Sequence, residues 1–62
     1  MVLDIIMKNG KDFFFNLDVV NENCRSIYAT GIYGNVYRLT KKHGEVYVDG
    51  KFIGMASSYN CI

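Results

Sequence analysis

The side chains most suited to acid–base, nucleophilic or metal chemistry are few and widely spaced in this sequence. His43 is the only histidine, and Cys24 and Cys61 are the only cysteines. His43 stands between Lys42 and Gly44, where a solvated turn residue is expected rather than a general base. The spacing of these three residues matches no metal-ligand set, and no fourth ligand is evident. We therefore expect no enzyme activity, no metal and no cofactor.

The acidic residues and the glycines are equally dispersed. The six carboxylates mostly fall beside expected turns or on outward strand positions, where solvation and edge protection explain them. The glycines occur singly, so they form no phosphate-binding loop ahead of a helix. The sequence therefore indicates no catalytic centre, and we expect the protein to act through surface contact with another molecule.

Aromatic and basic side chains interleave along the second half of the chain. Small β domains use such mixtures to contact other proteins, and some use them to bind single-stranded nucleic acid by stacking and phosphate contact. The net charge of +1 is weak for phosphate neutralisation, so protein contact is the preferred interpretation. The candidate contact residues are Phe14, Tyr33, Tyr37, Arg38, Tyr47 and Phe52, with Lys41 and Lys42 steering the approach of a partner.

The turn residues predict the β-strands that must position these side chains. Asn9-Gly10 and Asp49-Gly50 each separate two short runs of β-branched and aromatic residues, which is typical of β-hairpins. The chain is thus predicted to be all-β, a single small domain over residues 1–62 built as an antiparallel meander of about five strands. It would form a curled sheet or a small barrel. A short helix over residues 18–29, capped by Asp18 and ended by Gly31, is the alternative.

Matching apolar faces gives the expected register of the first hairpin. Alternation sets Leu3, Ile5 and Met7 on one face, and Phe13, Phe15, Leu17 and Val19 on another. A three-residue loop over residues 8–10, with Gly10 left-handed, brings these faces together. It pairs Met7 with Lys11, Ile5 with Phe13 and Leu3 with Phe15. A two-residue loop would pair Ile5 with Phe14 instead. In the preferred register Phe14 points outward, toward another part of the fold or a partner chain.

The later hairpins are expected to follow their own turn residues. A loop over residues 21–25 leads into a strand over residues 26–33, and Gly34-Asn35 makes a tight turn. A four-residue loop over residues 41–44 pairs Leu39 with Val46 and Tyr37 with Val48, and sets Arg38 opposite Tyr47. At Asp49-Gly50 a two-residue loop pairs Tyr47 with Phe52, whereas a bulged loop pairs Val46 with Phe52. The tail over residues 56–62 either pairs as a last edge strand or frays.

The run Val46-Tyr47-Val48-Asp49-Gly50-Lys51, followed by Phe52-Ile53-Gly54, resembles the hairpin of PEGA-type domains. The resemblance would imply a structural module of the cell envelope. Met55-Ala56-Ser57 stands where that family has a Thr-Thr-Pro ending, and the chain contains no proline. We interpret the match as shared hairpin chemistry.

Length and composition bound the function. A domain of 62 residues has a marginal core and often needs oligomerisation or another aid. No apolar run is long enough to span a membrane, and residues 1–4 lack the basic start of an export signal. A cytoplasmic protein is expected, with Cys24 and Cys61 as free thiols and one bridge between them as the alternative.

The expected function is non-enzymatic protein binding by a homodimer. The protein is expected to be a small inhibitor or adaptor of phage or mobile-element origin that blocks a larger host protein. Binding of single-stranded nucleic acid is the first alternative. The second is sequestration of a small ligand in a pocket between protomers. No membrane partner is expected.

Overall fold

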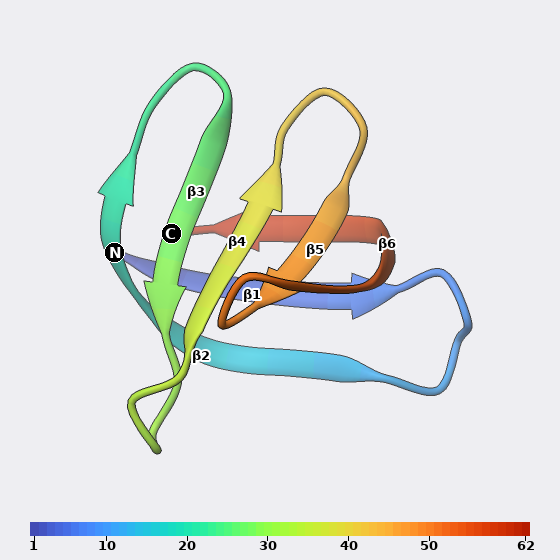
Figure 1. Ribbon diagram of the computed structural model, residues 1–62, viewed down its shortest axis with the longest axis horizontal. Coiled ribbons are helices and arrows are strands. Elements are labelled where there is room, and N and C mark those ends of the chain that lie inside the picture. Colours follow the sequence, from blue (N-terminus) through green and yellow to red (C-terminus); the bar gives the residue numbers. More distant parts are fainter.

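A computed structural model describes all 62 residues of the chain. It contains no helix, and hence none long and apolar enough to cross a membrane. Six strands follow one another along the chain (Figure 1). They are β1 (Val2–Met7), β2 (Phe13–Glu22), β3 (Ser26–Thr30), β4 (Val36–Thr40), β5 (Glu45–Val48) and β6 (Lys51–Cys61). The all-β prediction is confirmed.

The strands close into an antiparallel barrel in which each strand pairs with its neighbours in sequence and β1 also pairs with β6. The expected meander of about five strands has six. Residues 56–61 continue β6 and pair with β1, so the alternative in which the tail frays is wrong. Two reciprocal hydrogen bonds complete the closure: the Val2 N–H donates to the Ile62 carbonyl at 2.7 Å, and the Ile62 N–H donates to the Val2 carbonyl at 2.8 Å. A closed barrel leaves no free sheet edge.

Two long, bent strands make this closure possible. Residues 13–18 of β2 pair with β1 and residues 18–22 pair with β3, while residues 51–55 of β6 pair with β5 and residues 56–61 pair with β1. In Figure 1, β1 and the adjoining part of β2 cross the β3–β4–β5 layer at a steep angle. The corner in β6 falls beside Gly54, whose φ of +140° suits glycine alone.

The core fills the inside of the barrel and draws on five strands. Ile27 of β3 pairs with Leu39 of β4, which in turn pairs with Val46 of β5, so three fully buried side chains form one layer. The expected inward face of β1 is confirmed. The nine buried apolar residues are Leu3, Ile5, Met7, Leu17, Ile27, Ala29, Tyr37, Leu39 and Val46.

The predicted register of the first hairpin is wrong, although Gly10 is left-handed as expected, with a φ of +71°. The loop spans four residues, 8–11, because the Asn9 carboxamide oxygen accepts the N–H groups of Lys11 at 2.8 Å and Asp12 at 3.0 Å. The strands consequently pair Ile6 with Phe13 and Ile5 with Phe14.

The segment over residues 18–29 is extended, so the alternative helix is wrong. The second half of β2 and the start of β3 flank a short loop over residues 23–25. The Asn23 carboxamide oxygen accepts the N–H groups of Arg25 at 2.8 Å and Ser26 at 2.9 Å, which makes a turn at the position where a helix would need its own backbone bonds.

The remaining hairpins divide between confirmed and corrected predictions. The loop over residues 41–44 sets Leu39 opposite Val46 and Arg38 opposite Tyr47 as expected. At Asp49-Gly50 the two-residue alternative holds: Tyr47 pairs with Phe52, and a bulge then sets Val46 opposite Gly54. The tight Gly34-Asn35 turn is wrong. Strand β3 ends at Thr30, which pairs with Val36, so residues 31–35 form a wider loop.

Candidate functional site

A bulge at Asn16 decides which aromatic side chains of β2 face outward. Asn16 has a φ of +60°, and its N–H donates to the Asp4 carboxylate at 2.8 Å. The strand gains one residue against β1 at this point, so its inside–outside alternation reverses. Leu17 faces the core on one side of the bulge, whereas Phe13 and Phe15 face outward on the other.

Phe13 and Phe15 form a paired aromatic projection, here named the β2 ridge. Phe13 is 59% exposed and Phe15 is 53% exposed. Their ring centroids lie 4.9 Å apart with an interplanar angle of 31°, within the range of favourable aromatic pairs. The ridge therefore presents two large, mutually supported apolar surfaces to solvent.

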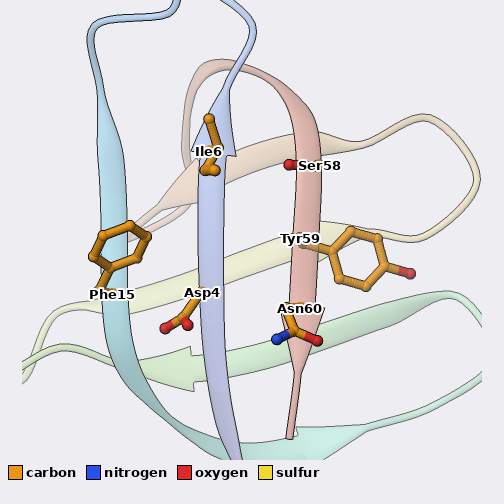
Figure 2. Close-up of a pocket in the computed structure, with 6 residues that line it drawn as sticks. All are labelled: Asp4, Ile6, Phe15, Ser58, Tyr59 and Asn60. Carbon is orange, nitrogen blue, oxygen red and sulfur yellow. The ribbon is translucent and has the colours of Figure 1, made fainter.

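A groove runs along each side of the β2 ridge, and Phe15 lines both. The first, named the Tyr33 groove, has a volume of about 260 Å³ and lies between β2 and the loop over residues 31–35. Tyr33 and Ile32 on this loop are 91% and 87% exposed. The second, named the Asp4 groove, has a volume of about 190 Å³ and lies over β1 and β6 (Figure 2).

Three of the predicted contact residues meet at the Tyr33 groove: Phe14, Tyr33 and Tyr37. The prediction that Phe14 points outward is wrong, because the Asn16 bulge places it on the inner side of β2. Its ring packs against the core, with its centroid 5.1 Å from that of Tyr37. Tyr37 is itself buried, and the Asn35 carboxamide donates to its hydroxyl at 3.0 Å.

Three further predicted residues form a separate cluster on β4, β5 and β6. The Arg38 guanidinium carbon lies 4.3 Å from the centre of the Tyr47 ring, and that ring meets Phe52 edge-on at 5.5 Å. Phe52 is 52% exposed. The stacked guanidinium holds one cation against an aromatic surface, and we name these three residues the Arg38 cluster.

Lys41 and Lys42, the two lysines expected to steer a partner, both lie in the loop between β4 and β5. The Lys41 ammonium is 2.7 Å from the Glu22 carboxylate. This hydrogen bond, against a smaller opposing effect of desolvation, raises the pKa of Lys41 above its ordinary value of 10.5. Lys42 is exposed. Neither lysine lines the two grooves.

The remaining reactive side chains do not gather. No three His, Cys, Asp or Glu side chains lie close enough together to hold a metal ion. Cys24 is exposed and Cys61 is half-buried, and both are free thiols. The two grooves are lined instead by aromatic, aliphatic and polar side chains, with the carboxylate of Asp4 in one of them.

The sequence interpretation missed the β2 ridge and Ile32. Strict alternation from Leu17 assigns Phe13 and Phe15 to the core, which is the opposite of their position. One signal was present: Asn16 is a polar residue that tolerates positive φ, in the middle of an aromatic strand.

Comparison of the chain with protein-family models, with curated proteins and with solved structures gave no significant match.

The Asn16 bulge predicts opposite effects for two substitutions. In Asn16→Gly the residue adopts the positive φ without a steric cost, so we expect the free energy of unfolding to stay the same or rise. Asn16→Val lowers the free energy of unfolding by about 1–3 kcal/mol, because a β-branched residue is strained at positive φ. Urea denaturation measures both. Asn21→Val, at an exposed position on the same strand, is the control and should change stability by less than about 0.5 kcal/mol. Equal losses at both positions would contradict the interpretation.

The Lys41–Glu22 pair predicts a dependence of stability on alkaline pH. Because folding raises the pKa of Lys41 above 10.5, the pair's contribution is fully present below that pH and is lost as the pH rises through the folded-state pKa. We expect the difference in Tm between wild type and Lys41→Gln to be constant near neutral pH and to shrink above pH 10.5. Lys42→Gln is the control and should show no such trend; a matching trend there would assign the effect to net charge.

Proposed function

We propose that this protein is a non-enzymatic protein-binding module that uses the β2 ridge to block or recruit a larger protein. Its size and lack of a reactive centre suit an inhibitor or adaptor encoded by a phage or another mobile element. The expected setting is the cytoplasm, where free thiols at Cys24 and Cys61 are stable.

The observation that supports this proposal is the bulge that exposes the ridge. Without the extra residue at Asn16, continuous alternation would place Phe13 and Phe15 on the core side together with Leu17. The chain instead adopts a positive φ at a non-glycine residue and leaves two phenylalanines more than half exposed. Bulges that redirect side chains are frequent beside functional sites, and exposed apolar surface marks binding sites. Aromatic side chains are also the residues that most often dominate binding energy.

The groove volumes favour partner side chains over a free small ligand. Pockets for drug-sized ligands usually measure about 300–1,000 Å³, whereas the two grooves measure about 190 and 260 Å³. Each groove is thus suited to a single side chain of a partner that covers the ridge. The ligand-sequestering alternative therefore requires a pocket that two protomers form together.

A matched set of variants tests the ridge. Phe13→Ser/Phe15→Ser removes it, and Phe52→Ser removes an equally exposed phenylalanine elsewhere on the barrel: Phe15 is 53% exposed and Phe52 is 52% exposed. In affinity capture from a bacterial lysate, we expect one host protein to be retained by wild type and by Phe52→Ser. The double variant should retain it at least about thirtyfold less, which corresponds to the loss of one hot-spot residue worth about 2 kcal/mol. Circular dichroism confirms that each variant is folded.

The same variants read out self-association. Multi-angle light scattering should give a dimer mass for wild type and a monomer mass for the double variant if two copies meet through the ridge. Monomers throughout would reject the dimer. A host protein retained equally by all three proteins would reject the ridge as the binding surface.

Nucleic-acid binding is the second candidate, and the Arg38 cluster is the observation that favours it. A guanidinium stacked on Tyr47, beside the exposed ring of Phe52, offers both stacking and phosphate contact. Fluorescence anisotropy with a labelled single-stranded oligonucleotide at low salt should then give binding that Phe52→Ser weakens and the ridge variant does not. No binding at low salt would remove this candidate.

A further inference from the structure

The Asp4 groove contains a carboxylate and other polar groups beside the apolar β2 ridge. Outward-facing side chains from three adjacent strands meet there: Phe15 from β2, Asp4 from β1 and Asn60 from β6. Asp4 and Asn60 are cross-strand partners. Figure 2 shows Phe15, Asp4 and Asn60 in a row across the three strands, with Ile6 further along β1 from Asp4. The ring of Tyr59 extends to the far side of β6, so Phe15 is the aromatic wall of this row.

The Asp4 carboxylate has an acceptor oxygen to spare. Its Oδ1 accepts the Asn16 N–H at 2.8 Å, which fixes the orientation of the carboxylate. The ion pair of this protein joins Lys41 to Glu22, and no cation of the chain pairs with Asp4. Ser58 and Asn60 are exposed beside it. A fixed, uncompensated negative charge thus lies next to an aromatic ring and a carboxamide.

A guanidinium group matches this arrangement better than other cations. Its flat face stacks on an aromatic ring, and its fork of N–H donors reaches two acceptors at once. The Phe15 ring supplies the flat contact, while the Asp4 carboxylate and the Asn60 carboxamide oxygen supply the acceptors. An ammonium group offers a point charge without the planar fork. The groove volume of about 190 Å³ is suited to one side-chain end.

We propose that the Asp4 groove binds an arginine side chain of the partner that covers the β2 ridge. The inference rests on the proposed function, and it specifies the partner's chemistry: an arginine placed beside the apolar surface that meets Phe13 and Phe15. Arginine is among the residues enriched at binding hot spots. Burial of the contact by the partner strengthens the ion pair, since screening by water decreases.

The groove can be tested without knowing the partner. The full chain, labelled with ¹⁵N, is titrated with the blocked tripeptide acetyl-Gly-Arg-Gly-amide, and two-dimensional NMR follows the backbone amides. We expect saturable shifts at Asp4, Phe15, Ser58 and Asn60. The same peptide with citrulline in place of arginine keeps the shape and removes the charge, and should produce no saturable shifts. A lysine peptide should bind more weakly than the arginine peptide.

Two variants with the same change in net charge separate a local site from general attraction. Asp4→Asn keeps an oxygen that can accept the Asn16 N–H, so the bulge persists, and we expect affinity for the arginine peptide to fall about fivefold, within the range of an exposed ion pair. Asp18→Asn, at another exposed position, should leave affinity within about twofold. Phe15→Leu keeps an apolar side chain without the ring and should weaken binding as well.

Each outcome decides the proposal. Equal binding of the citrulline peptide, equal loss in Asp18→Asn, or no shift in the groove would overturn it. If the arginine peptide fails while the ridge variant still loses its host protein, the arginine site is wrong and the proposed function stands. If the peptide binds the groove but the ridge variant retains the host protein as well as wild type does, the groove binds arginine and the proposed role of the ridge is wrong.

Discussion

The pairing of β1 with β6 is the constraint on which the rest of the structure depends. Strand β1 lies between β2 and β6, and its inward side chains Leu3, Ile5 and Met7 form one side of the core. A sheet left open between these strands would expose both backbone edges and part of that core. Closure in turn requires β2 and β6 to bend, and both strands carry register shifts, at Asn16 in β2 and beside Gly54 in β6.

The bulges connect this architecture to the surface. Reversal of alternation at Asn16 lets one strand contribute Leu17 to the core and Phe15 to the exterior within three residues. Asp4 takes part in both arrangements, because its carboxylate holds the bulge through one oxygen and faces the groove beside Phe15. The position of the ridge and the polarity of its neighbouring groove are therefore set by one contact between β1 and β2.

The parts of the fold that could be predicted from sequence are those decided by local turn chemistry. The loop over residues 41–44 fixes its own register, so the pairing of Arg38 with Tyr47 followed from residue types alone. The Asp49-Gly50 turn left two registers open, and the structure has the one that pairs Tyr47 with Phe52. The ridge did not follow, because its exposure depends on a hydrogen bond between Asp4 and Asn16, which are distant in sequence. The loop over residues 8–11 likewise depends on the two hydrogen bonds that the Asn9 carboxamide oxygen accepts, and an Asn-Gly pattern alone does not specify them. Three aromatic residues of the site, Phe13, Phe14 and Phe15, were thus assigned to the wrong face, although their strand was predicted correctly.

The hydrogen bonds between Val2 and Ile62 also affect how the barrel assembles. Most of its ladders join strands that are neighbours in the chain and are able to form as soon as each hairpin exists. The β1–β6 ladder joins the two ends, so its formation carries the largest loop-closure entropy of the fold. During synthesis on a ribosome, one edge of β1 would stay unpaired until residues 56–61 of β6 had emerged. The final step of folding is accordingly expected to be the docking of a preformed meander onto its own first strand.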